Sequence, residues 1–282
     1  MKNTEVYLKI KEKIEKADAI VIGAGAGLST AAGIDYGSKK FKKNFPELVK
    51  HYGFTDMYTS SFYDFETEEE RWSYWAKHIG YLCVNKDATE TYKKLFELVK
   101  NKNYFIITTN VDRQFIKSGF EKEKVFEIQG ALSKIQCSRA CHNKLYDDTD
   151  MILSMLKENN DIKIPSKLVP KCPVCGENMD VNLRKDEYFV EDDYWDKHQK
   201  SYDKFISKNK NKKILFLELG AGFNTPGIIR YPFETFTYEF SNAFLIRVND
   251  KYSLVPNEIK EKSLSVENDI NELIDKLSEV KL

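Results

Sequence analysis

The chain has 282 residues, which is more than one minimal core requires and fewer than two full-sized domains need. Apolar residues make up 41%, and 44 basic residues balance 44 acidic ones, so nothing indicates nucleic acid or an anionic membrane as a partner. The chain contains neither an apolar run of 18 residues nor a signal-peptide core at its start. We therefore expect a cytoplasmic protein built as one large domain with a smaller module.

The spacing of apolar residues predicts helices and strands in alternation. The predicted helices cover residues 6–17, 28–34, 72–82, 92–99 and 270–277, and Ser29 and Thr30 are placed to cap the second. Short apolar runs predict buried strands at 19–22, 104–108, 125–128, 214–219 and 243–248. Residues 35–66 show no clean period and are interpreted as a mobile loop with short helices. The alternation predicts an α/β fold with a doubly wound, parallel, Rossmann-like sheet.

The strand–helix rhythm stops between residues 131 and 186, where prolines and paired cysteines accumulate. We interpret 131–186 as a small zinc-binding module inserted into a nucleotide-binding domain that consists of 1–130 and 187–282. This division places the module directly after the third predicted strand.

Four of the five cysteines form two close pairs, which are Cys137 with Cys141 and Cys172 with Cys175. In a chain without an export signal, such pairs indicate metal ligands before disulfides. Two pairs on separate turns predict a tetrahedral four-cysteine zinc site, whose filled shell makes the metal structural. Four unrelated thiols are the alternative, and His142 is a possible substitute ligand. Cys83 lies on a helical pattern and is expected to be a buried apolar filler.

A glycine-rich turn, Gly-Ala-Gly-Ala-Gly at residues 23–27, follows the first predicted strand. Small residues before a helix N-terminus let backbone amides approach a phosphate. The dehydrogenase fingerprint G-x-G-x-x-G does not fit, because Leu28 or Thr30 stands at its last position. A tight turn without a ligand is the alternative, but the place after strand one of an open sheet favours nucleotide binding.

Several motifs in order resemble the sirtuin family. They are residues 25–29 (Gly-Ala-Gly-Leu-Ser), 33–36 (Gly-Ile-Asp-Tyr), 109–112 (Thr-Asn-Val-Asp) and Asn249 at the end of the last predicted strand. The resemblance spans most of residues 19–252 and implies that the chain uses NAD. The residues it implies for NAD binding are Gly25, Ala26, Gly27, Ser29, Asp35, Tyr36, Asn110, Asp112, Gln129, Gly220, Ala221, Gly222, Asn224 and Asn249.

The departures from the usual sirtuin pattern are themselves informative. Gln129 stands where deacylating sirtuins have histidine, Gly37 replaces an arginine, and residues 220–226 (Gly-Ala-Gly-Phe-Asn-Thr-Pro) replace Gly-Thr-Ser. This combination resembles the macrodomain-linked, class M sirtuins. That resemblance implies protein mono-ADP-ribosyl transfer, with a lipoylated carrier protein related to the glycine-cleavage H protein as acceptor.

Three residues are the predicted catalytic group: Asn110, Asp112 and Gln129. Cleavage of the nicotinamide–ribose bond gives an oxocarbenium-like ribose, which the protein must shield and present to an acceptor. Asn110 is expected to hold a ribose hydroxyl or a water, and Asp112 to orient the nicotinamide amide or the loop. The alternatives are a turn asparagine and a helix cap before Arg113.

Gln129 decides the expected reaction. Its amide can position a hydroxyl but cannot remove a proton, whereas a histidine base is worth about 10²–10⁴-fold in rate. Transfer to an acceptor side chain does not need that step. A structural glutamine is the alternative for this position. A lysine deacylase and a non-catalytic NAD or ADP-ribose sensor are the alternative functions, and residues 228–234 are a candidate acceptor groove.

Overall fold

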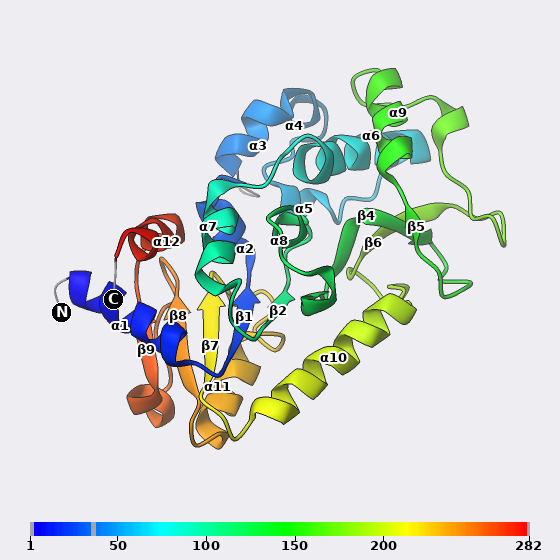
Figure 1. The fold of residues 1–282 in the computed structure, drawn as a ribbon. Helices are drawn as coiled ribbons and strands as arrows, with labels where there is room; N and C mark the ends of the chain where they lie inside the picture. The colour runs from blue at the N-terminus through cyan, green and yellow to red at the C-terminus, as the bar shows by residue number, and fades with distance from the viewer. Residues whose placement is uncertain (1–2, 35–37, 281–282) are drawn as a thin grey trace.

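A six-stranded parallel sheet forms the centre of the larger lobe in the computed structural model, which describes residues 3–34 and 38–280 (Figure 1). Its strands are β1 (Ala19–Ala24), β2 (Tyr104–Thr108), β3 (Val125–Glu127), β7 (Ile214–Leu219), β8 (Phe244–Val248) and β9 (Ser263–Val266). Their order is β3-β2-β1-β7-β8-β9, so the chain winds outward in both directions from the β1–β7 pair. This is the doubly wound order that the sequence predicts.

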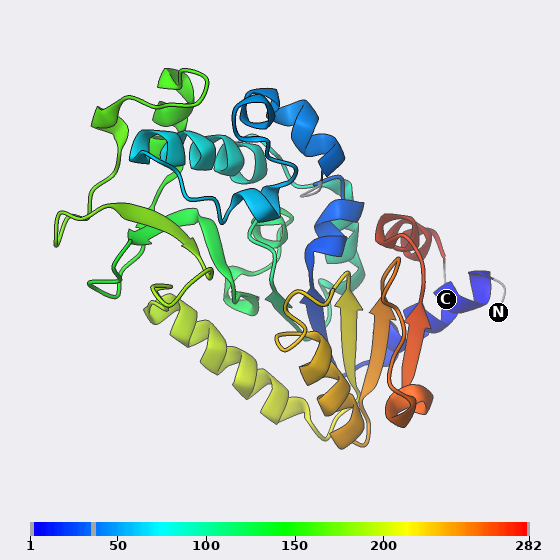
Figure 2. The same cartoon turned by 180° about the vertical axis from the view of Figure 1, so that it is seen from behind.

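Helices cover both faces of this sheet. They are α1 (Asn3–Lys16), α2 (Ala26–Ala31), α7 (Glu90–Val99), α8 (Gln114–Lys117), α10 (Asp193–Asn209), α11 (Arg230–Glu239) and α12 (Ile270–Glu279), with short 3₁₀ turns η2 (Lys122–Lys124) and η4 (Asn257–Lys262). Residues of α1, α2, α7 and α12 share one core cluster with the sheet. Residues of α10 and α11 share another on the opposite face, which Figure 2 shows toward the viewer.

The alternation along β1 explains why both faces are covered. Ile20 and Ile22 contribute to the first cluster, and Ala19 and Val21 to the second, all of them fully buried. Since each face of a parallel strand is covered, the strand is an apolar run rather than an alternating pattern. Gly23 follows in β1, and a Cβ there would lie 2.5 Å from atoms of Ile229 and Phe233 side chains, so glycine allows α11 to approach.

The second lobe contains a three-stranded antiparallel sheet in the order β5-β4-β6. Its elements are β4 (Gly130–Cys137), β5 (Tyr146–Asp147), β6 (Met179–Leu183), α3 (Ser38–Asn44), α4 (Pro46–Tyr52), α5 (Met57–Ser60), α6 (Glu68–Ile79), α9 (Thr149–Glu158), the π-helix η1 (Gly80–Val84) and the 3₁₀ turn η3 (Ser166–Leu168). One hydrophobic cluster joins these strands to residues from 34–82. The predicted domain limits stay a prediction, but this core draws on more of the chain than residues 131–186.

Most predicted elements are present, with specific differences. The helix expected at 28–34 is α2, which begins earlier, at Ala26, after Gly25 as N-cap. The predicted capping by Ser29 and Thr30 is wrong, because no side chain caps this helix and Ser29 lies inside it. The sequence also missed β9, α10 and α11. Among the described residues, no helix combines the length and apolar character that a membrane span requires.

The central sheet should dominate stability. Leu215 in β7 is 2% exposed, and Leu215→Ala should lower the free energy of unfolding by about 2–5 kcal/mol, because it leaves a cavity in the sheet–helix core. The matched change Leu153→Ala, at a side chain that is 46% exposed on α9, should cost under about 0.5 kcal/mol. Urea unfolding followed by circular dichroism measures both values, and equal losses would contradict this assignment.

Candidate active site

The carboxyl ends of β1, β2, β3, β7 and β8 lie along one edge of the parallel sheet, because parallel strands all point the same way. The predicted site residues follow these ends: the turn after β1, Asn110 after β2, Gln129 after β3, Gly220 after β7 and Asn249 after β8. In open α/β sheets this edge, at the reversal of strand order, is where ligands bind.

The turn after β1 packs directly on the backbone that follows β7. The Gly25 amide donates to the Leu219 carbonyl and the Gly27 amide to the Gly220 carbonyl, each at 3.0 Å. A Cβ on Gly25 would lie 2.6 Å from the Gly220 oxygen, and one on Gly27 2.7 Å from the Gly220 Cα. Gly25 and Gly27 are therefore required for backbone packing. The Gly25 and Gly27 amides already donate hydrogen bonds to the Leu219 and Gly220 carbonyls. Direct contact of Gly25, Gly27 or the intervening Ala26 with a phosphate therefore stays a prediction.

Gly220 completes this packing from the other side. Its φ is +66°, and a Cβ would lie 2.4 Å from the Leu28 nitrogen, so only glycine fits. Gly222 differs, since a Cβ there would meet nothing within 4 Å. The neighbouring Asn224 is exposed in the same loop. Gly222 and Asn224 are thus accessible to a ligand, whereas Gly220 is explained by packing.

Asn110 is held by its side-chain amide. Nδ2 donates to the Gly25 carbonyl at 3.0 Å and to the Tyr92 hydroxyl at 3.3 Å, and the backbone amide donates to Thr108 Oγ1 at 3.0 Å. Asn110 is only 5% exposed. Within the described ranges its Oδ1 accepts no hydrogen bond, so this oxygen is the atom that Asn110 offers to a ligand.

Asp112 and Ser29 belong to the same network. The Ser29 hydroxyl donates to Asp112 Oδ2 and lies 2.8 Å from the Tyr92 hydroxyl, while Asp112 Oδ1 accepts from the Gln114 amide at 3.0 Å. Both Ser29 and Asp112 are buried. The Asp112 carboxylate thus accepts from the first amide of α8, in line with the alternative of a helix cap before Arg113. It also links this loop to α2 through Ser29. Ser29 positions Asp112; a direct contact of either with NAD stays a prediction.

Tyr92 is the shared partner that the sequence did not identify as functional. This fully buried residue on α7 contacts both Ser29 and Asn110 through its hydroxyl, and burial raises its pKa well above the ordinary value. A neutral hydroxyl can donate and accept at the same time. Local sequence could not distinguish it, because Tyr92 also fits the apolar face of its helix.

Gln129 lies at the turn between β3 and β4. Its carbonyl accepts from the Arg184 amide at 3.0 Å, and its side-chain Oε1 is buried and has no hydrogen-bond partner among residues 3–34 and 38–280. Gly130 follows at φ +96°, where a Cβ would lie 2.2 Å from the Asn182 carbonyl, so β6 fixes the turn. An unpaired buried amide oxygen destabilises a fold by about 1–3 kcal/mol. A ligand that donates a hydrogen bond to Gln129 Oε1 would remove this penalty.

Arg184 is a second neighbour that the sequence missed. Its guanidinium lies 4.4 Å from the Phe189 ring centre and 5.3 Å from that of Trp195, and it pairs with Glu191. Trp195 Nε1 in turn donates to the Ile128 carbonyl at 3.2 Å. The Arg184 backbone thus contacts residue 129 from a segment more than fifty residues downstream, which no local motif indicates.

Glu127, two residues before Gln129, faces Arg113. Arg113 Nη1 lies 2.9 Å from Glu127 Oε2. Burial raises the Glu127 pKa to about 7, and the charge of Arg113 opposes this rise. Arg113 itself holds a left-handed conformation, with φ 63°. The acidic group next to the predicted site therefore titrates near neutral pH.

Asn249 joins the loops after β7 and β8. Its Nδ2 donates to the Ala221 carbonyl at 3.0 Å, and its Oδ1 accepts from the Lys251 and Tyr252 amides at 3.0 Å each. Asn249 and Ala221 are both buried, so their predicted contacts with NAD require either that the two loops move apart or that backbone atoms make the contact. Asp35 and Tyr36 lie outside the described residues.

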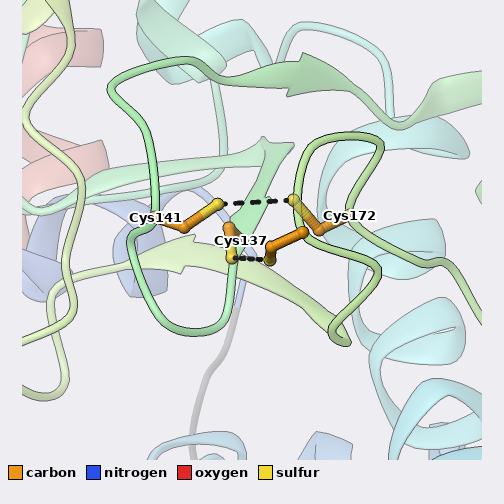
Figure 3. Close-up of side chains that lie close together, drawn as sticks. Cys137, Cys141 and Cys172 are labelled. Atoms are coloured by element: carbon orange, nitrogen blue, oxygen red, sulfur yellow. Dashed lines mark hydrogen bonds between the residues drawn. The ribbon is translucent and has the colours of Figure 1, made fainter.

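The four paired cysteines meet at one point in the second lobe. The sulfurs of Cys137, Cys141, Cys172 and Cys175 all lie within 4.8 Å of one another. The Cys137 and Cys175 sulfurs are 3.6 Å apart, as are those of Cys141 and Cys172, and Figure 3 shows the labelled side chains of Cys137, Cys141 and Cys172 close together. A tetrahedral metal with bonds near ~2.3 Å needs sulfurs about 3.8 Å apart, so the cluster fits such an ion.

The Sir2 family model matches residues 25–214, from the turn after β1 to the start of β7. The chain belongs to the Sir2 family. The resemblance to sirtuins is thereby confirmed over a range that includes parts of both lobes. A solved Sir2 homologue–NAD complex has a TM-score of 0.57 with this chain at 18% identity, covering 96% of this chain and 92% of that one. This likeness shows that the fold is shared.

Two relatives are more similar in sequence. One, named protein ADP-ribosyltransferase, from Staphylococcus aureus (strain Mu50), is 35% identical over 266 residues, which are 94% of this chain and 84% of that protein. Another, from Fusarium oxysporum f. sp. cubense, is named probable bifunctional ADP-ribose hydrolase/ADP-ribosyltransferase and is 33% identical over 284 residues. That match covers 95% of this chain but 47% of the relative, so this sirtuin spans about half of its length.

The raised pKa of Glu127 predicts a pH dependence of stability. Between its unperturbed value of 4.5 and its folded value of about 7, the folded protein keeps a proton that the unfolded chain releases, so stability falls as pH rises through this window. The melting temperature of Glu127→Gln should therefore rise relative to that of wild type as the pH is raised from about 5 to about 8.

Asp148 provides the comparison for that measurement. In the part of the chain that the structure describes, both of its carboxylate oxygens are buried without partners, and burial raises its pKa to about 7 as well. Asp148→Asn should also reduce the fall in melting temperature over the same pH range, and the effects of the two substitutions should add. A wild-type melting temperature that rises steadily from about pH 5 to about pH 8 would contradict both assignments.

Proposed function

We propose that this sirtuin is an NAD-dependent protein mono-ADP-ribosyltransferase. The observation that carries the proposal is Gln129, which by the sequence resemblance corresponds to the histidine base of deacylating sirtuins, and whose amide oxygen is buried with no partner among the described residues. Glutamine orients a hydroxyl but takes no proton. The names of the two relatives support the same reaction.

The reaction needs little acid–base chemistry from the protein. The bond between nicotinamide nitrogen and ribose C1′ breaks, nicotinamide leaves with the electron pair, and an acceptor side chain forms a new bond to C1′ and loses its proton. The free Oδ1 of Asn110 and the free Oε1 of Gln129 are the acceptors placed to hold ribose hydroxyls or an ordered water. Fixing the cofactor in this way lowers the barrier by positioning.

The acceptor is proposed to be a lipoylated carrier protein related to the glycine-cleavage H protein. This proposal rests on the resemblance of Gln129 and residues 220–226 to the class M pattern. Purified protein is incubated with labelled NAD and a lipoylated or unlipoylated carrier, and separately with an acetyl-lysine peptide. Label on the lipoylated carrier without free lysine supports the proposal, whereas efficient release of lysine contradicts it. A cytoplasmic location and the lack of nucleic-acid or membrane partners stay predictions.

Asn110→Ala should lower transfer at least about 100-fold, because the ribose-facing oxygen and the tie to Gly25 are lost together. The melting temperature should also fall, since two buried side-chain hydrogen bonds are lost and each is worth about 0.5–1.5 kcal/mol. Asn209→Ala removes an equally buried amide at the end of α10 and is the matched control. Transfer by Asn110→Ala near the wild-type rate would show that Asn110 is misassigned.

Gln129→Ala should reduce transfer at least about tenfold while NAD binding measured by calorimetry stays within about threefold, because Gln129 acts on the reacting ribose rather than on the whole cofactor. Gln129→Glu is the informative partner variant. It keeps the size and one acceptor oxygen, so it should retain more transfer than alanine. Equal activity of wild type and Gln129→Ala would leave the glutamine a structural role.

We further propose that the four-cysteine cluster holds zinc. Four sulfurs leave no open position, so the ion would serve the fold of the second lobe and not the reaction. His142 Nδ1 lies 3.0 Å from the Cys141 sulfur and its Nε2 lies 2.9 Å from the Tyr146 hydroxyl. Histidine thus stands beside the cluster, where it supports a ligand rather than replacing one.

The purified protein should contain about one zinc per chain, measured by mass spectrometry of the metal. Cys172→Ser should lose the metal and lower the melting temperature, because a structural zinc contributes to folding. Cys83→Ser, at the cysteine outside the cluster, should retain it. Full zinc content in Cys172→Ser would contradict the four-sulfur site.

A further inference from the structure

A buried group of charges lies beneath the loops that follow β7 and β8. Glu218 of β7 and Arg247 of β8 are register partners, and both side chains are 0% exposed. Arg247 Nη2 donates to Glu218 Oε2 at 2.8 Å. Glu234 of α11 lies 2.8 Å from Arg247 Nη1, and Arg230 at the start of that helix completes the group. None of the sequence motifs accounts for these four charges.

Arg230 connects this group to both loops. Its Nη1 donates to the Tyr252 carbonyl at 2.9 Å, and its Nη2 to the Leu254 carbonyl at 3.1 Å. Nη1 also lies 3.4 Å from the Ala221 carbonyl, and the guanidinium lies 4.4 Å from the Phe223 ring centre. One planar cation therefore touches the loop after β7 and the loop after β8 from below.

The loops that Arg230 holds carry much of the predicted NAD contact surface. Residues 220–224 include the accessible Gly222 and Asn224, and Asn249 begins the second loop. The Phe223 ring is 52% exposed and packs edge-on against Tyr252, at 5.2 Å between ring centres. Arg230 is 4% exposed, so it cannot touch the cofactor itself.

We propose that Arg230 is a positioning residue, which fixes residues 220–224 and 252–254 in the conformation that receives NAD. The inference rests on the proposed function. Two features make arginine necessary: its fork donates to two carbonyls at once, and its flat face stacks on Phe223. A lysine has one compact ammonium, so it lacks both the separated donor nitrogens of the fork and a flat face that can stack on Phe223. Loss of Arg230 also leaves Glu218 with one fewer positive neighbour.

The test compares Arg230→Lys with wild type in KM for NAD, kcat, the Kd of NAD by calorimetry, and melting temperature. We expect KM and Kd to rise about tenfold while kcat stays within about twofold, because in the variant NAD must order loops that Arg230 holds in place in the wild type. Phe223→Leu, which keeps the guanidinium and removes only the ring, should raise both constants by a smaller factor without a large change in melting temperature.

Arg71→Lys is the matched control in the second lobe. Arg71 Nη1 lies 2.7 Å from Asp180 Oδ1, and its Nη2 donates to the Met179 carbonyl at 2.7 Å, so this arginine also joins a carboxylate to a backbone oxygen. Arg71→Lys should lower the melting temperature and leave KM for NAD unchanged. If Arg230→Lys behaves in the same way, Arg230 is structural and the inference is overturned.

The outcomes separate this inference from the proposed function. If wild type binds NAD but transfers nothing, the proposed function fails, and the Kd of NAD alone decides the role of Arg230. If wild type transfers ADP-ribose and Arg230→Lys keeps the wild-type KM and Kd, the positioning role fails and the proposed function stands. A raised Kd of NAD in Arg230→Lys, with kcat unchanged, supports both the positioning role of Arg230 and the proposed function.

Discussion

The site depends on one backbone contact, the seating of the turn after β1 on the residues that follow β7. Gly25, Gly27 and Gly220 approach so closely that a Cβ on any of them would lie under 3.0 Å from the facing backbone. This contact sits where strand order reverses, and it fixes the start of α2 relative to the loop that begins at Gly220. The three glycines are thus explained by the packing of these two backbone segments.

A polar network extends from that contact into the site. The Gly25 carbonyl receives the Asn110 amide, and the Tyr92 hydroxyl links Asn110 to Ser29, which in turn donates to Asp112. Every member is buried, so each hydrogen bond is made in a medium of low dielectric, where a satisfied network is rigid and a broken one is costly. The result is that the orientation of Asn110 Oδ1 is fixed by one backbone carbonyl and by a chain of three side chains, Tyr92, Ser29 and Asp112.

The chemistry of the site follows from which atoms are left without partners. Gln129 Oε1 is buried and unpaired, and the turn that carries it is held by β6 through Gly130. Such a group favours a ligand hydroxyl over water, but it accepts only a hydrogen bond and never a proton. On the opposite side of the cofactor edge, Arg230 and Asn249 tie down the two loops from beneath. Positioning from both sides suits a reaction whose main demand is to hold a cleaving dinucleotide in place.

The sequence by itself determined the parallel sheet, the four-cysteine cluster and the order of the motifs. Apolar runs such as 214–219 and the cysteine spacings are local features, and the Sir2 family match confirms the frame that they indicated. Only the tertiary structure decided that Tyr92, Arg184 and Arg230 belong to the site region, because each reaches it from an element far along the chain. It also decided that Ser29 lies within α2 and contacts Asp112, where local preference predicted a cap. The reason is that hydrogen-bond partners of buried polar groups are chosen by packing between elements, which periodicity within one element does not encode.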